Sequence, residues 1–329
     1  MRRSELKEKT VKRRPNTNQA EKDNPKATEN EHNEETRRNV EPKYGPLPSF
    51  PNQRVFARGV MIVATLAIVY FTSKSDKETM LARQKEQIQG RGQNVDCSPD
   101  YLKDLTVFPG CVPEKCGRYV SDRLVTEAEA DILLDIGRRG LDLGSAEGGA
   151  AILDLHSGAL SRGKQFVNIY SLNNTDQLFS VQDFATYRVV RTKIQHAVAH
   201  HFGIAADSVF LTHPTFFSRL TDKPAVTIHD EYWHPHVDKD TYESFHYTSL
   251  LYLSHHGVEF QGGRFVFLEP DNATVVIEPR RGRVSMFTSG KENLHYIEPI
   301  TSGVRYALTV SFTCDKKFAI SDPTVPVTS

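Results

Sequence analysis

The part of the chain that follows Ala206 is a series of short apolar or alternating runs separated by turn residues. The runs include "SVFLTHPTFFSRL", "YTSLLYLS", "GRFVFLE", "TVVIEP", "RVSMFTS" and "RYALTVSF", and stretches such as "EFQGGR" and "EPRRGR" supply the turns. Strands this short, joined by Gly- and Pro-containing turns, are typical of a β-sandwich or a barrel-like sheet. We therefore expect a sheet of many short strands to dominate the fold.

Two helices are predicted before these strands. The pattern Thr126-Glu-Ala-Glu129 is a capping box, and it opens an apolar-periodic helix that extends to about Leu141. A second helix is predicted from near Ser180 to Phe202, with Gly203 as its stop. The expected fold class is α+β and mainly β, namely a double-stranded β-helix (jelly roll) backed by helices.

The length and charge of the chain limit its organisation and its partners. A chain of 329 residues allows one substantial core plus extensions. Its 41 basic and 41 acidic residues cancel, which argues against nucleic acid as a general partner. Residues 1–57 are dominated by Lys, Arg, Glu, Asn and Pro. Because such a segment cannot bury enough apolar surface to offset its ordering entropy, we predict a disordered tail there.

An isolated apolar run follows this tail. The uncharged stretch Val60–Thr72 has 13 residues, which is short for a membrane span of about 20 residues. Adding Val55–Ala57, with Arg58 extending its side chain to the interface, makes a thin membrane reachable. A cleavable signal peptide is not expected because the run starts far from the N-terminus. A buried core helix would have to lie between two polar segments. We therefore predict a single transmembrane signal anchor over residues 58–73.

The orientation of this anchor is predicted from the cysteines and sequons of the chain, because basic residues flank the run on both sides. All four cysteines and both N-x-Thr sequons lie after the run: Cys97, Cys111, Cys116, Cys314, Asn173 and Asn272. An even number of cysteines without a C-x-x-C pair favours disulfides over zinc, and three pairings are possible. These features predict a type II membrane protein of the endoplasmic reticulum or Golgi, with a cytosolic tail and a luminal body. The alternative is four reduced cysteines and two chance sequons.

The body is expected to contain four segments. Residues 74–120 are expected to form a stem with cysteine-bearing loops, and residues 121–205 a helical support region. The jelly roll is expected over residues 206–315, followed by a C-terminal tail over 316–329.

The stretch "HDEYWHPHVDKD" at residues 229–240 is the first half of a candidate metal site. Two imidazoles and one carboxylate bind iron on one face and leave positions open for other ligands. Side chains two residues apart in a strand share a face, so His236 and Asp238 can act together, with His234 as the rival ligand. The third ligand must come from a distant strand, and His295 is the candidate.

A strand beginning ten residues after His295 has two unlike faces. One face carries a guanidinium and three small side chains, in Arg305, Ala307, Thr309 and Ser311. The other face is bulky and suits the core, with Tyr306, Leu308, Val310 and Phe312. Because arginine can bind a carboxylate through two hydrogen bonds, a hollow beside Arg305 suits a dicarboxylate.

This set of residues resembles the iron- and 2-oxoglutarate-dependent oxygenases. The motif His236-x-Asp238, His295 and a basic residue ten positions on is most similar to the prolyl 4-hydroxylase-like branch. The segments "YTSLLYLS" and "GGRFVFLEP" fall where that branch has a Tyr-bearing strand and a Gly-Gly strand. The plant-type branch, which has Arg-x-Ser, is less similar because this chain has Arg305-Tyr-Ala307. The oxygenase match covers about residues 206–315. Segments such as "ILDLHSGAL" and "SGKENLH" resemble one member of the family across most of 97–325.

The resemblance implies a role for each candidate residue. His236, Asp238 and His295 would be the catalytic residues that bind Fe(II), while Arg305 and Tyr252 would bind 2-oxoglutarate. Enzymes of this family consume 2-oxoglutarate and O2, release succinate and CO2, and hydroxylate an unactivated C–H bond, with L-ascorbate as an implied helper. The substrate is not identified, and a polypeptide, at proline, is the leading candidate. The alternatives are a non-catalytic luminal scaffold or metal-binding module on the same barrel, and a zinc-binding lectin-like jelly roll.

Overall fold

The computed structural model describes residues 51–73, 77–172, 178–227 and 230–324, and the chain divides into two compact units. Met1–Val69 is the first unit and Tyr70–Ser329 the second. Most of the predicted tail and the sequon at Asn173 lie outside the described residues.

Helix α1 (Gln53–Ser73) contains the predicted anchor. Within it, Gln53–Phe71 has a mean hydropathy of 1.7 and none of it is buried. By length and composition it can cross a membrane, and it is the single such helix among the described residues. The helix begins before the predicted start of the anchor at residue 58, so residues 53–57 are helical and are not part of a disordered tail.

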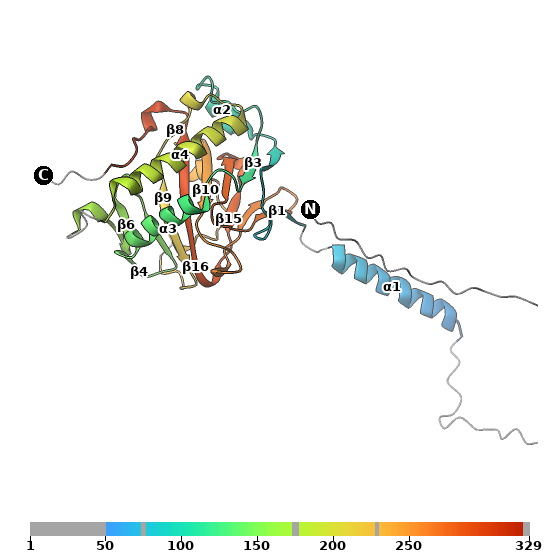
Figure 1. Ribbon diagram of the computed structural model, residues 1–329. Helices are drawn as coiled ribbons and strands as arrows, with labels where there is room; N and C mark the ends of the chain where they lie inside the picture. The colour runs from blue at the N-terminus through green and yellow to red at the C-terminus, as the bar shows by residue number, and fades with distance from the viewer. Residues whose placement is uncertain (1–50, 74–76, 173–177, 228–229, 325–329) are drawn as a thin grey trace, which may run out of the picture. The chain divides into compact units, whose positions relative to one another are not determined.

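The second unit is built on two sheets that have separate strand orders (Figure 1). The smaller sheet has the order β1-β13-β12-β15, with strands β1 (Glu78–Ala82), β13 (Thr274–Ile277), β12 (Phe265–Leu268) and β15 (His295–Ile297). The larger sheet has 12 strands. Its main path is β2 (Arg91–Val95), β3 (Cys116–Ser121), β14 (Val284–Thr288), β10 (Tyr247–Tyr252), β16 (Ile300–Thr313), β9 (Phe216–Thr221), β5 (Ala150–Leu153), β6 (Ala159–Gly163) and β4 (Ser145–Ala146). Three strands pair beside this path, β7 (Gln165–Asn168), β8 (Phe210–Leu211) and β11 (Phe260–Gly262).

The two sheets share a buried apolar core. Leu250, Tyr252 and Phe287 of the larger sheet cluster with Phe265 and Phe267 of the smaller one. Burying the inner faces of two sheets against each other is the arrangement of a β-sandwich. The unit is therefore mainly β with helices, as expected for a jelly roll.

Helices α3 (Glu127–Leu141) and α4 (Val181–Phe202) cover the other face of the larger sheet (Figure 1). Both begin at capping boxes, at Thr126 and at Ser180, and Gly203 ends α4 in the left-handed conformation. Both predicted helices are confirmed. The bulky face of β16 packs beneath them, as its alternation predicted. The remaining helices that the described residues form are short: α2 (Pro99–Leu105), α5 (Asp238–Thr241), η1 (Ile169–Ser171), η2 (Ala206–Ser208), η4 (Lys291–Asn293) and η5 (Lys316–Phe318).

The segment 74–120 was expected as a stem, but its described residues, 77–120, supply strands to both sheets. Strand β1 pairs in parallel with β13, and β3 lies between β2 and β14. Leu81 and Ala82 are buried in the core between the sheets. The expectation was wrong because β1 and β3 pair with β13 and β14, which lie far away in the chain, and no local pattern shows such partners. Similarly, the expected helical region also supplies strands β4–β7.

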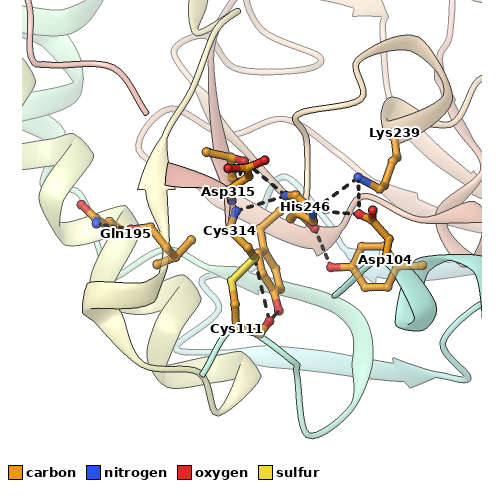
Figure 2. The surroundings of a disulfide bond; sticks show 11 residues. Asp104, Cys111, Gln195, Lys239, His246, Cys314 and Asp315 are labelled. Carbon is orange, nitrogen blue, oxygen red and sulfur yellow. Dashed lines mark hydrogen bonds and ion pairs between the residues drawn. A yellow bond between two sulfur atoms is a disulfide. The ribbon is translucent and has the colours of Figure 1, made fainter. Parts of the chain in front are cut away.

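Two disulfides involve this N-terminal segment, and one of them joins it to the rest of the unit. Cys97 pairs with Cys116, which closes a loop around α2, and Cys111 pairs with Cys314 at the end of β16. Figure 2 shows the second disulfide beside a buried polar cluster centred on His246. The Cys111–Cys314 link joins residues 203 positions apart in the chain, which restricts the unfolded state and thereby favours the folded one.

The His246 ring lies just before β10 and is almost fully buried. Its Nδ1 accepts a hydrogen bond from the Cys314 N–H at 3.1 Å, and its Nε2 lies 2.9 Å from Asp104 Oδ2 (Figure 2). The neutral ring with its proton on Nε2 satisfies both contacts. Burial, together with the nearby Lys239 ammonium, lowers the pKa of His246 to about 4.

We predict that this buried histidine makes the fold acid-sensitive. The unfolded chain binds a proton at His246 near pH 6.5, whereas the folded chain binds it only near pH 4, so stability is lost as the pH falls between these values. The loss attributable to this group is about 3 kcal/mol at pH 4. His246→Gln should flatten the pH dependence in urea unfolding of the full-length protein. The exposed His200→Gln is the control, and equal slopes for all three proteins would contradict the prediction.

Candidate metal centre

His236, Asp238 and His295 converge, with their ligand atoms all within 4.8 Å of one another. The His236 Nε2 lies 3.7 Å from Asp238 Oδ1, and the His295 Nε2 lies 3.6 Å from the same oxygen. Two imidazole nitrogens and one carboxylate oxygen facing a common point form a set that could hold a divalent metal ion.

A reciprocal backbone pair brings the two histidines together. The His236 N–H donates to the His295 carbonyl at 2.9 Å, and the His295 N–H donates to the His236 carbonyl at 3.0 Å. Asp238 then begins the short helix α5, so the pair lies at a bridge and a helix start and not along one regular strand. The side chains nevertheless meet, as the spacing predicted.

Hydrogen bonds orient both imidazoles. The Nδ1 of His236 lies 3.0 Å from the His234 carbonyl, and the Nδ1 of His295 lies 2.8 Å from the Asn293 carbonyl. A ring that donates through Nδ1 presents an unprotonated Nε2 to a metal. Burial of His295, which is 3% exposed, lowers its pKa and favours this neutral form.

Thr248 on β10 orients the carboxylate. The Asp238 Oδ2 accepts a hydrogen bond of 2.6 Å from the Thr248 hydroxyl, which also lies 2.9 Å from the Ser289 hydroxyl. The other oxygen, Oδ1, is left facing the two histidines. Sequence reasoning missed Thr248, because a threonine in a predicted strand carries no signal of which carboxylate it will contact.

The other acidic and histidine side chains of this stretch have different roles. His234 is exposed and its ring pairs with Glu231 at 2.6 Å, outside the cluster. Asp230 is buried and accepts hydrogen bonds from the N–H groups of Thr227 and Ala150, which attaches the loop to β5. The structure therefore separates His234 from its rival His236, while His229 lies outside the described residues.

Arg305 lies on the inner face of β16 and is 1% exposed. Its Nε donates to the Gly263 carbonyl at 3.1 Å, whereas Nη1 and Nη2 have no hydrogen-bond partner among the described residues. Leaving charged donors buried and unpaired is costly, and one carboxylate can satisfy both nitrogens. Gly263 has φ +64°, and a Cβ there would lie 2.4 Å from Ile300 Cδ1. A glycine is therefore required beside the guanidinium.

Two tyrosines lie near this guanidinium. The Arg305 Cζ lies 5.5 Å from the centre of the Tyr252 ring, and the Tyr252 hydroxyl lies 3.2 Å from Ser285 Oγ. Burial raises the pKa of Tyr252, so its hydroxyl stays protonated and can donate. Tyr232, which sequence reasoning did not assign, accepts a hydrogen bond from the Ile300 N–H on the same side. The buried arginine and the protonated tyrosine fit an organic dicarboxylate such as 2-oxoglutarate.

Of the two predicted glycosylation positions, the structure describes one. Asn272 is exposed in the turn between β12 and β13, at φ +61°. An exposed turn leaves its side chain accessible to modification.

Comparisons with known proteins agree with this geometry. The model of the 2OG-Fe(II) oxygenase superfamily matches residues 224–313. The chain is 52% identical over 247 residues to the 2-oxoglutarate and iron-dependent oxygenase domain-containing protein 3 of Xenopus tropicalis, covering 74% of this chain and 77% of that relative. With the human protein of that name, identity is 49% over 280 residues, covering 84% and 87%.

More distant similarities are narrower. Prolyl 3-hydroxylase 2 of Gallus gallus is 42% identical over 71 residues, which is 21% of this chain and 10% of that protein. Among solved structures, a Trichoplax adhaerens prolyl hydroxylase in complex with a hypoxia inducible factor oxygen degradation domain peptide fragment has a TM-score of 0.40 and 13% identity, covering 66% of this chain and 90% of the other.

We predict that substitution of His236 removes metal binding, whereas substitution of His234 does not. His236→Ala deletes one of three ligands and should abolish binding of Mn(II), used as an air-stable stand-in for Fe(II). His234→Ala removes an exposed ring and should leave the affinity within about 2-fold of wild type. Electron paramagnetic resonance of free Mn(II) during titration measures both. Loss of binding in the His234 variant would assign the ligands differently.

Proposed function

Because the chain belongs to the 2OG-Fe(II) oxygenase superfamily, we propose that it is an Fe(II)- and 2-oxoglutarate-dependent dioxygenase that hydroxylates a polypeptide and releases succinate and CO2. The observation that carries this proposal is the pairing of two features in one barrel. A His-Asp-His cluster can hold a metal, and nearby Arg305 has two buried nitrogens that lack partners among the described residues.

Each residue of the site would have its own part in the chemistry. His236, Asp238 and His295 would hold Fe(II) on one face and leave positions for 2-oxoglutarate and O2. The bound iron would supply the oxidation chemistry that couples decarboxylation of 2-oxoglutarate to hydroxylation. Arg305 would bind the distal carboxylate through two hydrogen bonds, and the protonated hydroxyl of Tyr252 would donate to the same group.

The burial of the ligands supports an entrance for the substrate on one side. The Asp238 side chain is 11% exposed, whereas the His236 side chain is 42% exposed. A large substrate would therefore approach past His236, where Trp233 and His234 precede the ligand in the same loop. Water would be excluded on the side of His295 and Arg305, because both are buried, His295 against Phe265 and Phe287 and Arg305 beside Tyr252.

A polypeptide substrate with proline as its target is the finer part of the proposal. It is supported by the match to prolyl 3-hydroxylase 2 over 71 residues and by the prolyl 4-hydroxylase-like motifs. Which carbon of the ring is hydroxylated is not part of the proposal. L-ascorbate is proposed as the reductant that maintains Fe(II).

We further propose a type II membrane protein with its catalytic unit in the lumen of the endoplasmic reticulum or Golgi. The proposal is supported by the span in α1, the two disulfides and the exposed Asn272. Disulfides persist in oxidising compartments, and the oligosaccharide is transferred only in the lumen.

We predict that Asn272→Gln removes one glycan from the protein made in cells. The glycosidase-sensitive mass shift on a denaturing gel should decrease by one step relative to wild type. Asn94→Gln, which changes an asparagine outside any sequon, is the control. A wild-type protein without any glycosidase-sensitive shift would contradict the luminal orientation.

We predict that the full-length chain, with Fe(II), 2-oxoglutarate, O2 and ascorbate, releases succinate. Arg305→Gln should weaken 2-oxoglutarate binding by about 100-fold, because charge-assisted hydrogen bonds contribute about 1.5–3 kcal/mol each, while Mn(II) binding is retained. Arg219→Gln on neighbouring β9, which removes an ion pair with Asp142 on the opposite face, is the control.

Succinate measured by mass spectrometry reports turnover, and the visible charge-transfer band under anaerobic conditions reports 2-oxoglutarate binding. No band and no succinate from the wild-type chain would favour a non-catalytic scaffold.

A further inference from the structure

Arg118 is a buried arginine outside residues 224–313, the part of the chain that the family model matches. It lies on β3 and is 1% exposed. A charged side chain is almost never fully buried unless it is paired. Here the guanidinium pairs with Glu269 and also contacts Gln93, so its charge is neutralised in place.

The remaining nitrogens of Arg118 contact the turn that precedes His295. Its Nε donates to the Asn293 side-chain oxygen at 2.7 Å, and Nη2 donates to the Glu292 carbonyl at 3.2 Å. Both partners belong to η4, which ends two residues before the candidate metal ligand. A residue of the N-terminal segment therefore holds a turn at the metal centre.

Asn293 transmits this contact to the imidazole. Its side-chain nitrogen donates to the Thr288 carbonyl at 2.7 Å, so the side chain is held from both ends, by Arg118 and by β14. Its backbone carbonyl accepts the hydrogen bond of 2.8 Å from His295 Nδ1. Fixing this carbonyl fixes the tautomer and the rotation of the ring.

Arg118 is also connected to His295 through an aromatic side chain, Phe267. The Arg118 Cζ lies 4.1 Å from the centre of the Phe267 ring, a cation–π distance. The Phe267 ring lies 6.0 Å from that of His295, and Phe265 stacks on the same imidazole at 4.9 Å. Arg118 thus contacts both Asn293, the hydrogen-bond partner of His295, and Phe267, an aromatic side chain beside its ring.

The same N-terminal segment contacts the turn before His295 at a second point, and it also contacts the loop that carries Asp238. The Ser98 N–H donates to Glu292 Oε2 at 3.1 Å, and Asp104 forms an ion pair of 2.8 Å with Lys239, the residue after the ligand Asp238 (Figure 2). Two disulfides hold this segment in place. The metal loops are therefore supported from outside the matched family segment.

We propose that Arg118 is a positioning residue for the metal centre, acting on His295 through Asn293 and Phe267. The proposal rests on the proposed function, because it requires that the cluster binds a metal. Lysine cannot replace Arg118, because a single ammonium cannot reach Asn293, Glu292 and Glu269 with the directed donors of a planar guanidinium.

The test is the affinity of the full-length chain for Mn(II), without cosubstrate and without turnover. Arg118→Lys and Arg118→Gln should each weaken Mn(II) binding by about 10- to 100-fold, the usual loss when a partner of a metal ligand is removed. Arg283→Lys is the matched control. Arg283 is also buried, and it bonds Asp122 and three backbone carbonyls, none of them in the metal loops. Its variant should lose thermal stability but keep its Mn(II) affinity.

A double-mutant cycle tests the route. If Arg118 acts through Asn293, the losses in Mn(II) affinity of Arg118→Lys and Asn293→Ala will not add. The affinity of the double variant will then equal that of the single variant that binds Mn(II) less tightly. Should both Arg118 variants fail to fold, Glu269→Gln removes the ion-pair partner of the guanidinium with a smaller perturbation and should still weaken Mn(II) binding.

The outcomes separate the two proposals. Wild-type Mn(II) binding with unchanged affinity in the folded Arg118 or Glu269 variants overturns the role of Arg118 alone. A wild-type chain that binds no Mn(II) overturns the proposed function, and the inference with it.

Discussion

The reciprocal hydrogen bonds between His236 and His295 are the constraint on which the site depends. They attach the loop before α5 to the start of β15, and so join two segments that lie far apart in the chain. Once the backbones are paired, the rings lie 4.5 Å apart between centres and Asp238 faces both of them. This pairing brings the loop that carries His236 and Asp238 against His295, a buried residue of β15.

The inner faces of β10 and β16 supply the rest of the site. Thr248 and Tyr252 lie on the same face of β10. The Thr248 hydroxyl donates to the Asp238 carboxylate, and the Tyr252 ring lies beside Arg305. On the neighbouring strand β16, the side chains of this face other than Arg305 are small, while the bulky side chains of its other face pack under α3 and α4. This strand pair therefore carries both the hydrogen-bond partner of Asp238 and the buried guanidinium of Arg305.

Local sequence patterns predicted the elements that are determined by residues close together in the chain. The helices from Thr126 and from Ser180 begin and end where their caps place them, because capping involves residues three positions apart. The strand "RYALTVSF" has the two unlike faces that its alternation predicted. The segment 74–120 was misjudged because its strands are stabilised by partners almost two hundred residues away, such as β13 for β1.

The sequence alone therefore determined the mainly-β class, the two long helices, an apolar helix at α1 and a short set of candidate ligands, since each follows from local spacing and composition. Although His234 and His236 share a face in an extended chain, the tertiary structure places only His236 beside Asp238 and His295. It also decided the disulfide partners and brought Arg118 to the metal loop. These outcomes depend on chain segments meeting in space, and no local pattern encodes which distant backbone a residue will bond.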